Sequence, residues 1–245
     1  MTRFLYIAAL CFASLLFLSC TYFERDNPCD ENGVNYNPNL LNCTGLYCSL
    51  CYEGQTYKTA VIGTQTWMAE NLNYNASGSK CYNNKSANCN KYGRLYNWST
   101  AMGLPSSCNS NSCSGKIKSN HQGICPSGWH IPDDSDWDKL YRYADSTSGT
   151  LSPYSSPTAG RYLKATSGWN SDGNGTDQYG FSALPGGFGY SDGSFKRVGD
   201  YGVWWSASEG NNDLTYYRYT SYNDENADWD YDDKSILLSV RCLQN

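Results

Sequence analysis

The sequence predicts an α+β domain that is built around an antiparallel sheet and braced by disulfide bonds. Short alternating strands between glycine-rich turns outnumber the helices. Ten of the 12 cysteines also remain once Cys11 and Cys20, which belong to the N-terminal signal described next, are set aside. No repeat of about 20 to 50 residues is visible, so we expect one domain with many loops.

The N-terminal segment has the layout of a signal peptide. Residues 4–18 form a largely apolar run without charge, and Ser19 and Cys20 follow it. This run is shorter than the roughly 20 apolar residues that a membrane-spanning helix needs. We therefore expect residues 1–19 to be cleaved and the protein to be exported.

A small residue directly before Cys20 resembles the signal of bacterial lipoproteins, in which the cysteine is acylated and becomes the mature N-terminus. Phe17 and Leu18 depart from the favoured pattern, which has Leu and then a small residue at those places. The resemblance implies lipidation of Cys20, a membrane partner through the lipid anchor, and a location at the outer membrane or cell surface. The alternative is plain secretion with Cys20 free or disulfide-bonded.

The charge balance argues against a nucleic-acid partner. The chain has 18 basic and 23 acidic residues, a net charge of −5, and no basic run. Nucleic-acid binding proteins present clustered Lys and Arg to the phosphates. We therefore expect no nucleic acid among the partners.

The ten remaining cysteines are an even number, which in an exported chain indicates disulfide bonds. They are Cys29, Cys43, Cys48, Cys51, Cys81, Cys89, Cys108, Cys113, Cys125 and Cys242. Their pairing does not follow from the sequence. A zinc site made by the first four is an alternative, which the oxidising compartment and the uneven spacing disfavour.

The first part of the mature chain predicts a tether and then a hairpin. Residues 20–51 are rich in Asn, Pro, Asp and Cys and lack apolar periodicity, so we expect a lipidated tether there and the globular domain over 52–245. Alternating residues from Tyr57 lead to Gly63-Thr64, which provides a two-residue turn into residues 65–70. That pattern predicts a β-hairpin.

Two helices and four strands are expected in the rest. Residues 94–102 predict a short helix that ends before Gly103. The clearest helix is 133–145, because its apolar residues recur at helical spacing and Asp133 can cap it. The strands are predicted at 181–184, 201–207, 214–221 and 236–242.

Three stretches resemble a known family. They are residues 66–72, then 123–132 with Trp137, and finally 175–187 with 204–207 and 238–242. Over residues 52–243 the chain is identified as a member of the Fibrobacter succinogenes major paralogous domain family. The resemblance implies an exported protein of fibre-degrading or related bacteria and names no activity.

Residues 129–132 with Trp137, and residues 239–242, are also similar to segments of the formylglycine-generating enzymes. This similarity implies a C-type-lectin-like fold, in which N- and C-terminal strands pair beside a helix. It also implies that Cys125 meets Cys242. Those enzymes bind copper with two late cysteines, whereas only Cys242 follows Cys125 here, so their chemistry is not expected.

No residue is predicted to be catalytic. A Ser-His-Asp arrangement would have to use His121 or His130, which are the only histidines. His130 lies in the helix-entry motif, where a packing or hydrogen-bonding role is expected. Carboxylate pairs are numerous but none has a diagnostic setting, so an unrecognised hydrolase stays an alternative.

Two acidic clusters are candidate calcium sites, because carboxylate and amide oxygens at short spacing suit this ion. The candidate ligands are Asp172, Asn174 and Asp177, and further along Asp228, Asp230 and Asp232. Neither cluster has the flanking helices or closing Glu of an EF-hand. The alternative for each is a solvated acidic loop.

The eight Trp and 22 Tyr are the strongest functional signal, because exposed rings stack on sugars. The candidate ligand-binding residues are Tyr217, Tyr219, Tyr222 and Trp229. Strand alternation places Tyr217 and Tyr219 on one face and Tyr216 on the other. The alternative is an aromatic-rich flank of the core, which is the role expected for Trp67, Trp98, Trp129 and Trp137.

These observations favour a surface-displayed, non-catalytic binding module for polysaccharide or for adhesion of the cell to fibre. One alternative is a structural envelope lipoprotein that contacts protein partners. The other is the unrecognised hydrolase.

Overall fold

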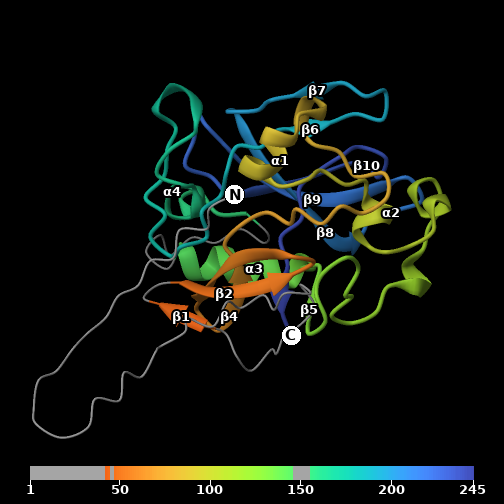
Figure 1. Cartoon of the computed structure of the whole chain (residues 1–245), viewed down its shortest axis with the longest axis horizontal. Coiled ribbons are helices and arrows are strands. Elements are labelled where there is room, and N and C mark those ends of the chain that lie inside the picture. The colour runs from red at the N-terminus through yellow and green to blue at the C-terminus, as the bar shows by residue number, and fades with distance from the viewer. Residues whose placement is uncertain (1–41, 45–46, 146–154) are drawn as a thin grey trace, which may run out of the picture.

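The computed structural model describes residues 42–44, 47–145 and 155–245 (Figure 1). The predicted signal peptide 1–19, the predicted lipidation site Cys20 and Cys29 lie outside the described residues. The side chains of Cys43 and Cys48 do so as well.

A six-stranded sheet runs in the order β1-β2-β3-β4-β11-β5, and its strand pairs are antiparallel. The strands are β1 Asn42–Thr44, β2 Tyr47–Tyr52, β3 Gln55–Ile62, β4 Gln65–Met68, β5 Trp129–His130 and β11 Leu243–Gln244. Leu243 pairs with both Trp67 and His130, so the chain end closes the sheet between β4 and β5. The boundary predicted at 51/52 falls inside β2, whose Leu50 is fully buried.

The hairpin predicted at Gly63-Thr64 is confirmed. Ile62 of β3 pairs with Gln65 of β4. Gly63 has a φ of 63°, which L-residues with a side chain rarely adopt. A Cβ at this position would also lie 2.8 Å from the Tyr143 ring, so the turn requires glycine.

A second antiparallel sheet has the order β10-β9-β8, and a two-stranded sheet joins β6 to β7 (Figure 1). Their bounds are β6 Phe188–Gly189, β7 Phe195–Lys196, β8 Tyr201–Glu209, β9 Leu214–Ser221 and β10 Asp228–Asp233. The strands predicted at 201–207 and 214–221 are therefore confirmed as β8 and β9. β10 contains the second candidate calcium cluster, a segment for which the sequence predicts no strand.

Two predicted strands are wrong. Residues 181–184 make only an isolated bridge, from Ala183 to Lys164. Residues 236–242 are extended and buried on both sides, but they bond to several segments in turn and not to one neighbouring strand. The Leu238 N–H donates to Tyr96, for example, and the Ser239 N–H to Val203.

Helix α3 (Asp134–Ala144) confirms the clearest helix prediction. Asp133 accepts the Asp136 N–H at 3.1 Å, and Asp136 accepts the Asp133 N–H at 3.3 Å, which forms a reciprocal capping box. The helix predicted over 94–102 is the single turn α2 (Trp98–Ala101). The remaining helices are α1 Ser86–Tyr92, α4 Ala159–Leu163 and the 3-10 turns η1 Tyr82–Asn84, η2 Ser106–Asn109, η3 Ser114–Lys116 and η4 Asn170–Asp172.

The core lies on both faces of β8. Val203 and Trp205 belong to one buried cluster, whereas Trp204 packs in another with Trp137 of α3. The four tryptophans predicted to be core residues are at most 1% exposed: Trp67, Trp98, Trp129 and Trp137. Each of these indoles is therefore a packing residue and not part of a surface platform.

Three disulfide bonds join described residues. They are Cys81–Cys89, Cys108–Cys113 and Cys125–Cys242. The pairing of Cys125 with Cys242 is confirmed. Cys51 is also disulfide-bonded, so it is not the thiolate that the zinc alternative required.

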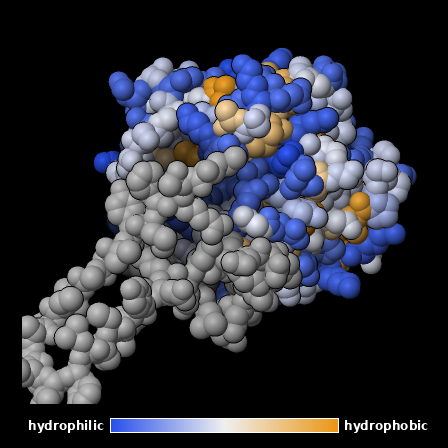
Figure 2. Space-filling model, in the orientation of Figure 1, coloured by the Kyte–Doolittle hydropathy of each residue, from blue (hydrophilic) through white to orange (hydrophobic). Residues whose placement is uncertain are grey.

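The α+β class with antiparallel sheets, few helices and disulfide bracing is confirmed. The surface in Figure 2 is mostly hydrophilic, with scattered apolar residues. Every helix in the described ranges is too short or too polar to cross a membrane.

Candidate functional site

The three-stranded sheet has one face against α3 and one face that forms a groove. Tyr217 and Tyr219 alternate with Arg218 along β9, and Tyr217 pairs with Asp230 of β10. Directly paired residues project from the same face of a sheet. Arg218 projects from the other face, where its guanidinium lies 2.8 Å from Asp134 of α3. The two tyrosines and Asp230 therefore share the face that α3 leaves open.

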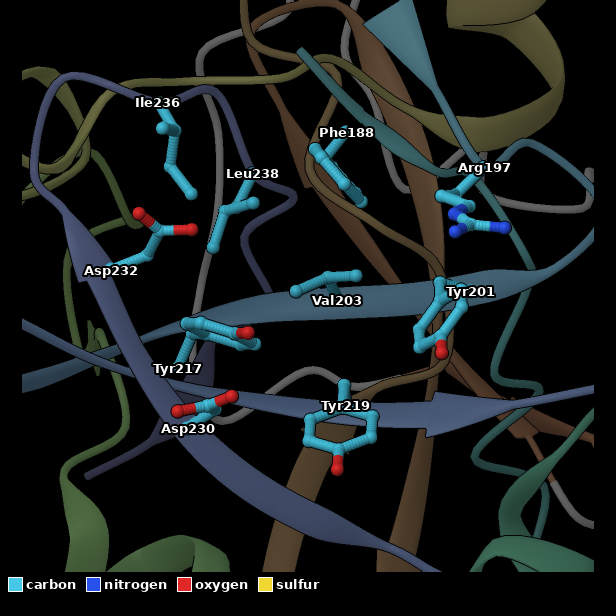
Figure 3. Close-up of a pocket in the computed structure, with 10 residues that line it drawn as sticks. All are labelled: Phe188, Arg197, Tyr201, Val203, Tyr217, Tyr219, Asp230, Asp232, Ile236 and Leu238. Carbon is cyan, nitrogen blue, oxygen red and sulfur yellow. The ribbon is translucent and has the colours of Figure 1, made fainter. Parts of the chain in front are cut away.

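The groove encloses about 270 Å³ (Figure 3). It is lined by four aromatic, two acidic, three aliphatic and one basic residue: Phe188, Tyr201, Tyr217 and Tyr219; Asp230 and Asp232; Val203, Ile236 and Leu238; and Arg197. Strands β6, β8, β9 and β10 and the extended segment after β10 all contribute. The site thus depends on the packing of the second half of the domain.

Three tyrosine rings form a continuous row along the groove. The Tyr201 and Tyr219 ring centroids lie 6.0 Å apart, and those of Tyr217 and Tyr219 lie 6.1 Å apart. In Figure 3 Phe188 lies on the other side of Val203 from Tyr219. All four rings are only partly buried, so each has surface left for a ligand.

Burial and the neighbouring carboxylates keep the groove phenols protonated. Burial first, and then Asp230 and Asp232, raise the pKa of Tyr217 well above its ordinary value. Burial first, and then Asp228 and Asp230, raise the pKa of Tyr219 to about 12. The two hydroxyls therefore stay hydrogen-bond donors and acceptors at neutral pH.

The acidic residues of β10 bond to their own strand. One carboxylate oxygen of Asp228 accepts the Trp229 N–H at 2.8 Å, and one of Asp230 accepts the Tyr231 N–H at 2.8 Å. Asp232 accepts the next N–H in the same way, at 2.7 Å. A carboxylate has further acceptor capacity on its second oxygen. Asp230 and Asp232 can therefore be held by the backbone and still face a ligand.

Two of the four predicted ligand-binding residues lie outside the groove. Trp229 pairs with Arg218 and so projects from the opposite face, where its ring packs 5.6 Å from that of Tyr216. Tyr222 packs against the core cluster that contains Trp204. Tyr217 and Tyr219 are the two that the structure places in the groove.

Sequence reasoning missed Phe188 and Tyr201 as groove residues. Tyr201 is two residues from Val203 in a predicted strand, so alternation places both on one face. Nothing in the sequence signals which face lines a groove. Phe188 belongs to β6, a two-residue strand that is too short to show an alternating pattern in the sequence.

The candidate calcium ligands do not converge. Asp228, Asp230 and Asp232 follow one another along β10, and each accepts the N–H of the residue after it. In the other cluster Asn174 accepts the Trp169 N–H, and Asp177 accepts both the N–H and the hydroxyl of Ser182. Within the described ranges no group of three or more His, Cys, Asp or Glu is placed to hold a metal. Calcium thus stays a prediction from the sequence alone.

Both histidines line a second, polar pocket of about 360 Å³, and both are fully hydrogen-bonded. His130 is 4% exposed and bonds to Asp136 at 3.1 Å and to Asn245 at 2.7 Å. The His121 ring accepts the Lys118 N–H at 3.2 Å and bonds to the Met102 carbonyl at 2.8 Å. Because both nitrogens of each ring are hydrogen-bonded within the protein, we interpret both imidazoles as structural groups. This agrees with the hydrogen-bonding role expected for His130.

The fold and the groove define a disulfide-braced α+β domain with an aromatic, acidic surface site. Residues 61–244 match the family model of the Fibrobacter succinogenes major domain, so the chain belongs to this family, as the motifs implied. Comparisons with curated proteins and with solved structures gave no match.

Proposed function

We propose that this protein is an exported, lipid-anchored binding module that holds polysaccharide in the groove on β8, β9 and β10 and performs no catalysis. The observation that supports it best is the row of Tyr201, Tyr219 and Tyr217 on a sheet face. Aromatic rings stack on the apolar faces of sugar rings, while hydroxyls and carboxylates bond to sugar hydroxyls. The groove supplies both kinds of group side by side.

The size of the groove suits part of a chain. Small-molecule sites usually enclose about 300 to 1,000 Å³ and bury most of the ligand. The groove, with about 270 Å³, lies just below this range. It therefore suits a short stretch of a polymer that continues past it on both sides, as in attachment to fibre.

In this proposal the signal peptide directs export, and lipidation of Cys20 with a tether that ends before β1 holds the groove outside the cell. They rest on the apolar run before Ser19-Cys20 and on the membership of the family. Growth with a labelled fatty acid should label the wild-type protein and leave Cys20→Ser unlabelled. Label on the Cys20→Ser protein would contradict the anchor.

The proposal includes a C-type-lectin-like fold. Its support is that β11, at the chain end, pairs with β4, near the start of the domain, while α3 packs against β8. The Cys125–Cys242 bridge fastens the same chain end to the segment before β5. An experimental structure whose topology differs from this arrangement would remove this part.

The groove is tested with the full-length chain in detergent on a panel of neutral, amino and acidic glycans. Tyr217→Ala should weaken binding about tenfold, because one stacked ring is worth about 1.4 kcal/mol. Tyr216→Ala is the matched control, since Tyr216 is on the same strand but on the opposite face. If no glycan of the panel binds, or if the two variants weaken binding equally, the proposal is contradicted.

A further inference from the structure

The groove is lined by more acidic than basic side chains. Asp230 and Asp232 line it together with a single basic residue, Arg197. The Arg197 guanidinium is already 3.7 Å from Asp200 and lies 5.8 Å from the centroid of the Tyr201 ring. Its charge is therefore partly balanced within the protein, and the groove as a whole presents negative charge to a ligand.

The sequence around these carboxylates is acidic. Residues 222–233 contain six acidic residues and neither Lys nor Arg, and the next residue, Lys234, is buried and paired with Glu209. β10, which carries both groove aspartates, is the outer strand of its sheet among the described strands. Asp230 is exposed and Asp232 is half-buried, so both are accessible from solvent.

Aromatic rings and carboxylates that face one space are the two groups that bind ammonium ions in proteins. The domain itself uses this combination elsewhere. The Lys234 ammonium lies 4.9 Å from the centroid of the Trp98 ring and 2.7 Å from Glu209. The groove repeats this chemistry without a lysine of its own, since its only lining cation is Arg197.

We propose that the groove selects glycans that carry free amino groups, with an ammonium group between Asp230, Asp232 and the Tyr217 ring. This inference rests on the proposed function and names its ligand class. Neutral sugars have the stacking contacts without the charge contacts. Uronic acids bring a second negative charge to the carboxylates and are disfavoured.

The raised pKa of Tyr217 fits this picture, because burial and the two aspartates both oppose a further negative charge at that place. The same carboxylates that keep the phenol protonated would hold the ammonium of an amino sugar. A bound cation would also lower that pKa again, since an opposite charge favours the phenolate.

The test is calorimetry of the full-length chain in detergent with three oligosaccharides of equal length, made of glucosamine, N-acetylglucosamine and galacturonic acid. At a pH that protonates the amines, we expect the glucosamine oligomer to bind about tenfold more tightly than the N-acetyl oligomer. The galacturonic acid oligomer should bind most weakly. The preference should shrink with added salt, because screening weakens exposed charge contacts.

The double variant Asp230→Asn with Asp232→Asn should reduce this tenfold preference to about twofold. Asn keeps an oxygen that accepts the following backbone N–H, so the strand stays capped. Asp228→Asn is the matched control: Asp228 caps its own strand in the same way but does not line the groove. It should leave the preference within about twofold of wild type, and circular dichroism checks that each variant is folded.

The outcomes separate this inference from the proposed function. Equal binding of the glucosamine and N-acetyl oligomers, or tighter binding of galacturonate, overturns the amino-sugar inference and leaves the polysaccharide module standing. No binding of any oligosaccharide overturns both. Binding of a lysine oligopeptide without any oligosaccharide also overturns both, because the groove would then be a site for basic protein segments.

Discussion

Removal of the Cys125–Cys242 disulfide should destabilise the domain more than removal of the Cys81–Cys89 disulfide. The bond joins residues 117 positions apart. In the chain-entropy model a loop of this length lowers the free energy of the folded state relative to the unfolded state by about 4.9 kcal/mol. The Cys81–Cys89 bond, with a separation of 8, gives about 2.6 kcal/mol in the same model.

The long loop contains no other cysteine, so no second bridge shortens it. Cys125, Cys242 and Cys89 are buried, whereas Cys81 is half-buried, so Ala substitution removes more buried contact at the first pair. Loop length alone gives a difference of about 2 kcal/mol, and the cavity at the buried pair adds to it.

The assay is urea unfolding of two double variants, Cys125→Ala with Cys242→Ala and Cys81→Ala with Cys89→Ala. We expect the first pair to lose about 5 kcal/mol, which is a large share of a typical domain stability of about 5 to 15 kcal/mol. Equal losses in the two double variants, with equal m-values, would refute the loop-entropy reasoning.

Three more predictions follow from the described contacts. Asp133→Ala removes the cap of α3 and should cost about 1 kcal/mol in urea unfolding; an unchanged midpoint would contradict it. Lys234→Met leaves the 5%-exposed Glu209 side chain without its ammonium and should cost about 3 kcal/mol, whereas the exposed control Lys139→Met should change stability by less than about 0.5 kcal/mol. Burial raises the pKa of Glu209, but the Lys234 and Cys113 bonds outweigh it and hold that pKa below 4.5. This stabilisation is present above pH 4.5 and is lost as the pH falls through the lowered pKa. As the pH is lowered from 4.5, the urea midpoint of unfolding should therefore fall more in wild type than in Lys234→Met.

The sequence predicted the elements whose signals are local. α3 combines helical periodicity with a capping aspartate, and both lie within one segment. The β3–β4 hairpin needs only alternation and Gly63, and β9 needs only alternation. These elements follow from the chain because neighbours within a few residues decide them.

The errors fall where tertiary contacts decide. Residues 236–242 alternate like a strand, but they are buried because β8, β6 and the segments that contain Leu72 and Tyr96 all bond to them. Residues 181–184 bond to two different segments: Ala183 forms a bridge with Lys164, and the Ser182 carbonyl accepts a hydrogen bond from the Arg241 side chain. Alternation shows that a segment is extended and does not show how many neighbours it has.

Two of the four predicted ligand-binding residues lie in the groove. Tyr217 and Tyr219 follow from strand alternation alone. The position of Trp229 on the opposite face does not follow from the predicted strands, because none of them includes 228–232, although the Asp-Trp-Asp-Tyr-Asp pattern there alternates. Aspartate is poor in strands by intrinsic preference, and here tertiary pairing with β9 overrides it.

That pattern explains why one short strand serves two purposes. An outer strand exposes backbone N–H groups that invite pairing with other chains, and charged side chains discourage this. In β10 the N–H groups of Trp229, Tyr231 and Asp233 donate to the aspartate that precedes each of them. Because side chains alternate at the same period of two, these aspartates also share one face, and two of them, Asp230 and Asp232, line the groove there. Two of the three carboxylates that protect the edge of the sheet therefore also give the site its charge.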